Sequence, residues 1–206
     1  MGNASSTIPL PPRPERRGIM EKLMNLIDRA RMFAITSHES QKRRYTQEDY
    51  VNHPIRVSSI VAMVTDDDEV IAAALLHDTV EDTRASIKEI KAYFGKRISS
   101  LVEELTNDPS LKTSHSRKER KILVRERLAK ASPEAQTIKL ADILDNTRDI
   151  VKHDPKFADV YLRENAELIE VLDRGNKDLI KLAKEHIEFS LGQLIEDPEE
   201  LTGVAS

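Results

Sequence analysis

Apolar residues recur every three or four positions along most of the chain, a spacing typical of amphipathic helices. The pattern begins at about Ile19 and continues to Ala34, and it resumes over 54–64 behind Pro54, a residue suited to the first turn of a helix. The segment Thr65–Asp68 is expected to end that helix and to cap the next one. No alternating pattern is long enough to predict a strand. We therefore expect an all-α fold, a bundle of about eight to ten helices.

Capping signals divide the second half of the chain. Ser86–Glu89 forms a capping box for a short helix that ends at Phe94–Gly95. Ser132–Pro133 and Asp154–Pro155 each place a proline directly after a capping residue, as at the start of longer helices. The segment 107–116 is polar and is expected to be a loop that orders on ligand binding. The remaining helices are expected at 98–105, at 116–130, from 132 to about 152, from 154 to 172 and up to about 195.

The stretch Ala72–Thr83 joins an apolar helix to a dense group of ionisable side chains. His77 and Asp78 follow a run of Ala and Leu that we expect to be buried. Burying these groups is costly without a partner, and nitrogen and oxygen ligands suit Mn²⁺, Fe²⁺ or Zn²⁺. If the helix continues, Glu81 and Asp82 lie one turn further along the same face, where two carboxylates could handle a water. The alternative is a helix cap or a surface ion pair.

Two further candidate ligands lie elsewhere in the chain. His53 precedes the proline of its helix, and Asp142 sits in the apolar frame 138–144. A carboxylate among so many apolar neighbours needs a cation or a hydrogen-bonding partner. The purely structural alternative treats the histidines as ordinary core residues and pairs Asp142 with Lys139 or Arg148. The set expected for a metal site that keeps positions open for water and substrate is His53, His77, Asp78 and Asp142.

Composition excludes several classes of protein. The 206 residues contain 32 Lys and Arg against 36 Asp and Glu, a net charge of −4 that argues against nucleic acid as a partner. Cysteine is absent, so disulfides, thiolate metal sites and a cysteine nucleophile are ruled out. No apolar run approaches the length of about 18 residues that a membrane span requires, and no signal peptide is visible. We expect a cytoplasmic protein without a membrane partner.

The ends of the chain differ in composition from the middle. Residues 1–18 are rich in Ser, Pro and Arg and are expected to be a disordered leader. Met1–Ser6 fits the short pattern for N-myristoylation at Gly2. The folded domain is expected at 19–196, followed by a flexible tail at 197–206.

Longer motifs around the candidate ligands resemble a known family. The chain has YVNHP at 50–54, ALLHDTVEDT at 74–83, FG at 94–95 and KLAD at 139–142. These strings are similar to the HD superfamily of metal-dependent phosphohydrolases, and within it to the hydrolase domain of RelA/SpoT-type alarmone enzymes. The resemblance covers roughly 19–194 and is nearest to the small, stand-alone alarmone hydrolases.

The resemblance implies a reaction, a cofactor and roles for named residues. It implies Mn²⁺-dependent removal of the 3′-pyrophosphate from ppGpp or pppGpp, which releases GDP or GTP and pyrophosphate. Glu81 and Asp82 match the family's catalytic pair, which positions and deprotonates a water. Arg43 and Arg44 match a basic pair that contacts the nucleotide, and Asn146 matches an asparagine that reaches it. The implied metal ligands are His53, His77, Asp78 and Asp142.

Two departures from the family pattern concern substrate choice. The turn Tyr45–Asp49 lacks the family's glycine and is one residue longer, and Asp145 stands where the family often carries His or Tyr. A guanine preference therefore does not follow, and an adenine alarmone, a dNMP or NADPH remains an alternative substrate. A non-catalytic nucleotide-binding module would be expected to lack the acidic pair, which is present. The oligomeric state stays open, with a dimer among the options.

Overall fold

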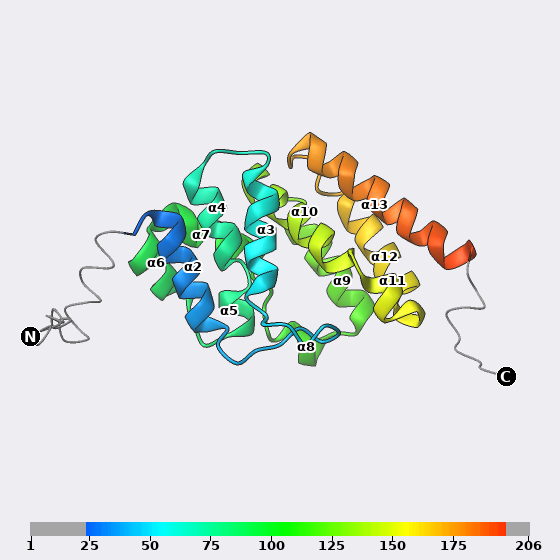
Figure 1. Ribbon diagram of the computed structural model, residues 1–206, viewed down its shortest axis with the longest axis horizontal. Helices are drawn as coiled ribbons and strands as arrows, with labels where there is room; N and C mark the ends of the chain where they lie inside the picture. The colour runs from blue at the N-terminus through cyan, green and yellow to red at the C-terminus, as the bar shows by residue number, and fades with distance from the viewer. Residues whose placement is uncertain (1–23, 197–206) are drawn as a thin grey trace, which may run out of the picture.

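The computed structural model describes residues 24–196, and in this range every regular element is a helix apart from one isolated bridge between Lys42 and Asp49 (Figure 1). The all-α prediction is confirmed, and the nine helices of eight or more residues within 24–196 agree with the expected number. Three further helices are single turns of four residues. The helices are α2 (Leu26–Ser37), α3 (Asn52–Ala62), α4 (Asp68–Leu76), α5 (Thr79–Asp82), α6 (Ile87–Phe94), α7 (Lys96–Leu105), α8 (Leu111–Ser114), α9 (Arg117–Leu128), α10 (Pro133–Thr147), α11 (Ile150–His153), α12 (Pro155–Ile169) and α13 (Lys177–Glu196).

Helix α4 forms the centre of the core. Every residue from Val70 to Leu76 is buried, because α2, α3, α7 and α10 all pack against this helix. Asp67 caps it as predicted, since its carboxylate accepts hydrogen bonds from the backbone N–H groups of Glu69 and Val70. The chain therefore leaves α4 at His77 from inside the protein.

Helix α10 is the second buried helix, and α3 contacts both α4 and α10 (Figure 1). Ser132 caps α10 and Pro133 opens it, as the sequence predicts. On the far side of α10 lie α12 and α13, which pack on each other. The first turn of α3 and the last turn of α4 thus meet the middle of α10, and the candidate ligands lie at this junction.

Several element boundaries differ from the prediction. Helix α4 does not run on through 77–82; it ends at Leu76, where the hydroxyl of Thr79 donates to the carbonyl of Leu76. Helix α10 ends at Thr147, and the chain turns so that Ile150 is buried as the first residue of α11. Helix α12 ends at Ile169. The chain there tightens into a turn in which backbone hydrogen bonds join residues three apart.

The predicted loop at 107–116 contains the single turn α8, and the charged helix after it begins at Arg117 behind a capping box made by Ser116 and Glu119. The predicted leader with Gly2, the start of the first helix at Ile19 and the tail at 197–206 lie outside the described residues. Among the helices of the described range, none combines the length and the apolar character that a membrane crossing requires.

Candidate metal centre

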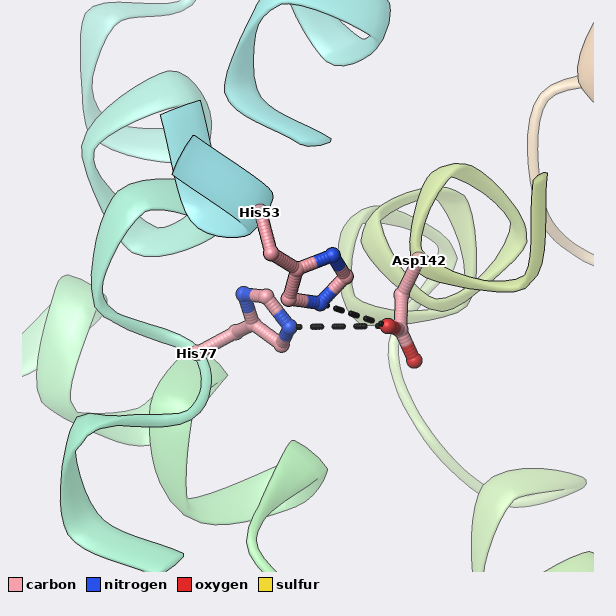
Figure 2. A group of neighbouring side chains, drawn as sticks. All are labelled: His53, His77 and Asp142. Atoms are coloured by element: carbon pink, nitrogen blue, oxygen red, sulfur yellow. Dashed lines mark ion pairs between the residues drawn. The ribbon is translucent and has the colours of Figure 1, made fainter. Parts of the chain in front are cut away.

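Two histidines and an aspartate from three separate elements converge inside the protein (Figure 2). His53 comes from the first turn of α3, His77 from the turn after α4, and Asp142 from the middle of α10. Nε2 of His53 lies 3.1 Å from Oδ1 of Asp142, and Nε2 of His77 lies 3.7 Å from the same oxygen. All three side chains are buried, and each offers an atom within 4.8 Å of the others.

Asp78 completes the group from its solvent side. Its Oδ2 lies 3.4 Å from Nε2 of His53, and its Oδ1 lies 3.2 Å from Nε2 of His77. The Asp78 side chain is 21% exposed, whereas that of Asp142 is 6% exposed. The structure therefore brings together all four residues that the sequence singles out, with one side open to an incoming molecule.

The arrangement fits a divalent cation. Nδ1 of His77 is hydrogen-bonded to the backbone oxygen of Ala74 at 2.8 Å, and Nδ1 of His53 to Oδ2 of Asp145 at 2.7 Å. Both Nε2 atoms are buried, and within the described residues neither makes a hydrogen bond, although carboxylate oxygens lie close by. An unsatisfied buried nitrogen is costly, and a cation between the two rings and the carboxylates would satisfy both.

Electrostatics favours positive charge at this point. Burial alone lowers the pKa of His53, but the neighbouring carboxylates of Asp142, Asp145 and Asp78 raise it to about 9. Burial also opposes the charged form of Asp142, yet Lys139 and the two histidines hold the pKa of this carboxyl well below its usual range. Carboxylates that stay ionised beside inward-facing imidazoles provide a potential in which a divalent metal is stable.

Lys139 contacts the outer oxygen of Asp142. Its Nζ lies 2.6 Å from Oδ2, while Oδ1 faces the histidines and accepts a hydrogen bond from Nδ2 of Asn146 at 2.5 Å. Arg148, the other partner considered from the sequence, pairs instead with Asp149. The structural alternative thus explains the Lys139 contact at Oδ2, but not the two imidazole nitrogens that face Oδ1.

The acidic pair on α5 lies beside the candidate ligands. The hydroxyl of Tyr50 is 2.7 Å from Oδ2 of Asp78 and 3.0 Å from Oδ2 of Asp82, so one side chain links both carboxylates. The backbone oxygen of Asp82 accepts a hydrogen bond from Gln41. These contacts hold Asp82 next to the metal centre while its side chain stays exposed.

Glu81 lies on the side of Asn107. Its Oε2 accepts hydrogen bonds from the backbone N–H and from Nδ2 of that residue, at 3.0 and 2.9 Å. The first residue of the predicted polar loop therefore fixes the orientation of this carboxylate.

Two cavities open beside the centre, and Asn146 and Tyr161 line both of them. The first, of about 320 Å³, is lined by Arg43, Arg44 and Tyr45 of the segment 42–45, which we call the basic loop. The second, of about 280 Å³, extends from Glu81 and Asp142 along α9 and α12. Both cavities therefore border Asn146, the residue hydrogen-bonded to Asp142 of the centre.

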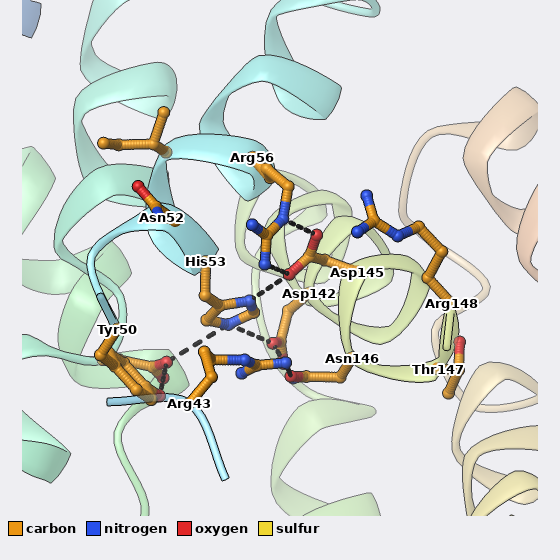
Figure 3. A network of polar contacts seen from close by, with 12 residues as sticks. Arg43, Tyr50, Asn52, His53, Arg56, Asp142, Asp145, Asn146, Thr147 and Arg148 are labelled. Atoms are coloured by element: carbon orange, nitrogen blue, oxygen red, sulfur yellow. Dashed lines mark hydrogen bonds and ion pairs between the residues drawn. The ribbon is translucent and has the colours of Figure 1, made fainter. Parts of the chain in front are cut away.

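The basic loop supplies two arginines in different settings. Nη2 of Arg43 donates to Oδ1 of Asn146 at 2.9 Å (Figure 3). The guanidinium of Arg44 lies 5.1 Å from the ring centre of Tyr45, and that ring stacks on His153. Only Arg43 of this pair is hydrogen-bonded to the α10 residue next to the centre, whereas Arg44 presents a flat surface at the rim of the first cavity.

The departures from the family pattern have local explanations. Within the glycine-free turn, Gln47 adopts the left-handed backbone conformation with φ of 58°, which glycine favours, and its side chain donates to the carbonyls of Arg43 and Arg44. Asp145 borders the first cavity, but its oxygens are bound by His53 and Arg56.

Sequence reasoning assigned no role to several residues around the centre. These residues are Tyr50, Arg56 and Asn107, and their contacts join positions far apart in the chain. Asp145 entered the sequence analysis only for substrate choice, although its spacing three residues after Asp142 on a buried helix was a usable signal for a place near the centre. Lys139 pairs with Asp142, as the structural alternative expects.

An all-helical protein with His and Asp residues gathered between the ends of its central helices has the features of the HD domain. The HD domain family matches residues 30–168, and the chain belongs to this family. With the His53, His77 and Asp142 cluster, this membership indicates a divalent metal.

Particular relatives share most of this fold. The chain is 46% identical over 127 residues to the guanosine-3′,5′-bis(diphosphate) 3′-pyrophosphohydrolase MESH1 of Drosophila melanogaster, which covers 60% of this chain and 68% of that protein. It is 35% identical over 176 residues to the Xenopus tropicalis MESH1, and the match covers 81% of this chain and 95% of that protein. The solved structure of a metazoan ortholog of SpoT that hydrolyses ppGpp matches with a TM-score of 0.74 and 36% identity, over 82% of this chain and 97% of that one. The resemblance seen in the sequence is thereby confirmed.

Proposed function

We propose that this protein is a metal-dependent (p)ppGpp 3′-pyrophosphohydrolase that converts ppGpp and pppGpp to GDP and GTP with release of pyrophosphate. The observation that carries the proposal is the convergence of two unpartnered imidazole nitrogens and two carboxylates beside the Glu81–Asp82 pair. Its relatives of 35–46% identity over 127 and 176 residues are named for this activity. Such a role places the enzyme in the cytoplasm with its nucleotide substrates.

The metal we propose is Mn²⁺, as the resemblance to the alarmone hydrolases implies, and the donor set of two imidazole nitrogens and two carboxylates suits a first-row divalent ion. Bound there, the cation supplies positive charge that polarises a phosphoryl oxygen and makes a water easier to deprotonate. The residues that would hold it are His53, His77, Asp78 and Asp142.

The acidic pair provides the proton chemistry in this proposal. Asp82, exposed and oriented through the Tyr50 hydroxyl, accepts a proton from the attacking water. Glu81, held by Asn107, orients that water from the side of the second cavity. The water then attacks the phosphorus that bears the 3′-oxygen, and the bond between them breaks. The 3′-oxygen takes up the proton held by Asp82 to become a hydroxyl, and pyrophosphate leaves the nucleotide.

The basic loop binds the nucleotide. The two diphosphate groups of the substrate need cationic partners, and its purine needs a flat surface on which to stack. An arginine side chain offers both. Arg43 beside Asn146 is placed to contact a phosphate near the centre, and Arg44 lies over an aromatic ring at the cavity rim. Asn146 can reach the sugar and the phosphates because it lines both cavities.

A product assay tests this function. Metal-free protein is given Mn²⁺, Mg²⁺ or Zn²⁺ in turn, with ppGpp, pppGpp, ppApp, dNMPs and NADPH as substrates. We expect pyrophosphate together with GDP or GTP from the guanine alarmones, and the highest turnover with Mn²⁺. Faster turnover of ppApp, a dNMP or NADPH would show that this compound, and not the guanine alarmone, is the preferred substrate. Binding without turnover of any of them would leave a nucleotide-binding module.

A further inference from the structure

Asp145 is buried between a candidate metal ligand and an arginine (Figure 3). Its Oδ2 lies 2.7 Å from Nδ1 of His53, and the two side chains are 2% and 0% exposed. Arg56 donates two hydrogen bonds to the same carboxylate: its Nε lies 2.5 Å from Oδ1, and its Nη2 lies 3.1 Å from Oδ2. The guanidinium also pairs with Glu48 at 3.0 Å. The carboxylate is thus fixed in position by one arginine and directed at one imidazole.

A histidine that binds a metal through Nε2 must carry its proton on Nδ1. An acceptor at Nδ1 fixes that tautomer and the plane of the ring, and a charged acceptor also makes the ligating nitrogen more basic. The two histidines of the centre differ here: His77 is held by the neutral carbonyl of Ala74, and His53 by the carboxylate of Asp145. His53 therefore has the stronger acceptor behind it.

We propose that Asp145, clamped by Arg56, is a positioning residue that holds His53 in the tautomer and orientation that direct Nε2 into the metal centre. The inference rests on the proposed function, because it needs His53 as a ligand. It also gives Asp145 a role at a position where the related alarmone hydrolases often carry His or Tyr. His53 and Arg56 both lie on α3, so a simple strut between α3 and α10 would use the same contacts, and the metal affinity separates the two roles.

The central experiment measures Mn²⁺ affinity of the Asp145→Asn variant by calorimetry and by the electron paramagnetic resonance of free Mn²⁺. We expect binding about 10- to 100-fold weaker than in the wild type, the effect usual for partners of metal-bound histidines. We also expect that excess Mn²⁺ restores part of the lost turnover, because the ligands themselves are intact. A merely structural strut would lower the melting temperature without changing the metal affinity of the folded protein.

The chain contains a matched control. Asp67 also receives two nitrogens of one arginine, Nη1 and Nη2 of Arg97 at 3.0 and 2.6 Å, but at the far end of α4. Asp67→Asn also breaks a two-nitrogen arginine–carboxylate contact, although a more exposed one, and we expect it to leave the Mn²⁺ affinity within about twofold of the wild type. A loss shared by both variants would overturn the proposal, because it would then reflect general destabilisation.

A second variant keeps the test decisive if Asp145→Asn does not fold. Arg56 is 26% exposed, so Arg56→Met alters the clamp from its more exposed side, and the Asp145 carboxylate keeps its contact with His53. It should weaken Mn²⁺ binding several-fold in the wild-type background and have no further effect together with Asp145→Asn, because both changes act through one contact. Unchanged affinity in Arg56→Met, with Asp145→Asn unfolded, would overturn the clamp.

A nuclear magnetic resonance experiment reads the tautomer directly. In ¹⁵N-histidine protein loaded with diamagnetic Zn²⁺, we expect a slowly exchanging Nδ1 proton on His53 that is lost in Asp145→Asn. His53→Ala separates the two proposals. If this variant loses metal while Asp145→Asn retains wild-type affinity and the Nδ1 proton, the metal centre stands and the positioning role fails. If His53→Ala keeps wild-type affinity, the proposed metal site fails, and the inference fails with it.

Discussion

Nη2 of Arg43 donates a hydrogen bond to Oδ1 of Asn146 over 2.9 Å and so ties the basic loop to helix α10. Asn146 in turn donates to Asp142 of the candidate centre, so two hydrogen bonds join the loop to a proposed metal ligand. The loop is held in place before substrate arrives, which lowers the entropic cost of binding a phosphorylated nucleotide.

Replacing Arg43 and Arg44 together by Ala should raise KM for ppGpp by about 10- to 100-fold with little change in kcat, because the arginines act in binding. The salt dependence of KM should become weaker, since fewer charged contacts remain to be screened. Lys at both positions should restore charge but not the flat surface, so it should recover only part of the affinity.

Lys181→Ala is the control for this loop, because Lys181 is exposed on α13, pairs with Glu185 and lines neither cavity. We expect its KM to stay near the wild-type value. A double arginine variant with KM within about twofold of wild type would show that the basic loop is only a solvated surface.

Variants of the acidic pair Glu81 and Asp82 should slow the chemical step without weakening substrate binding. Glu81→Gln and Asp82→Asn keep size and hydrogen-bonding capacity but remove the base, so kcat should fall by about 10²–10⁴ while ppGpp still binds. Single-turnover kinetics with a separate binding measurement checks this, with the exposed Glu185→Gln on α13 as control. A raised KM with unchanged kcat in either variant would assign the pair to binding.

Local signals predicted much of the fold. Ser86 and Ser132 cap helices that begin where the sequence places them, because a capping side chain acts only on its own first turn. The break between α10 and α11 has no such signal, since the helix is interrupted to bury Ile150 in the core. Contacts with other elements decide that boundary, and they cannot be seen in a local pattern.

The candidate site likewise contains residues that local signals predict and residues that they do not. Three proposed ligands, His77, Asp78 and Asp142, follow from polar residues in or next to apolar runs, and His53 from its place before the proline of α3. The structure brings the four together, while their role as ligands remains a prediction. Of the partners of these residues, the sequence indicated only Lys139. Tyr50 reaches Asp78 across 28 positions and Arg56 reaches Asp145 across 89, and no periodicity marks contacts of that range.

Metal dependence should show in stability as well as in activity. Mn²⁺ at 100 times its dissociation constant should stabilise the wild type by about 2.7 kcal/mol, because it binds the folded state. Asp78→Ala should lose this gain, retain no Mn²⁺ after gel filtration and have no measurable turnover, since it removes a charged ligand. The exposed Asp66→Ala is the control. Full activity of Asp78→Ala after exhaustive chelation would contradict the metal site.

Stability should depend on pH through Asp67. Hydrogen bonds from Arg97 hold the pKa of this carboxyl below its usual value of 3.8, so its charge stabilises the folded state above that pH and is lost on acidification through the lowered pKa. Asp67→Asn keeps the cap without the charge, so its deficit in unfolding free energy should be present at pH 6 and vanish at low pH. Asp67→Ala also loses the cap and should cost about 1 kcal/mol more. Urea unfolding between pH 2 and 6 measures both; a deficit of Asp67→Asn that does not change with pH would contradict the assignment.

Two glycines should respond to alanine in opposite directions. A Cβ on Gly175 would lie 2.8 Å from Cδ1 of Leu140, a fully buried side chain, and 3.4 Å from the backbone of Gln136. Gly175→Ala should therefore destabilise the protein by about 1–3 kcal/mol through overpacking. Gly192 lies within α13, and apart from its chain neighbours and the backbone of its own helix no atom of the described chain falls within 4 Å of its added Cβ. Gly192→Ala should stabilise by about 0.5–1 kcal/mol, because alanine is the better helix former.

Leu140→Ala identifies the cause of the Gly175 effect. This change removes the methyl group that the new Cβ would meet, so Gly175→Ala should cost less in the Leu140→Ala background than alone, with a coupling of about 0.5–3 kcal/mol. Urea unfolding of the two single variants and the double variant gives this coupling. Strict additivity would show that backbone conformation, and not contact with Leu140, requires glycine at position 175.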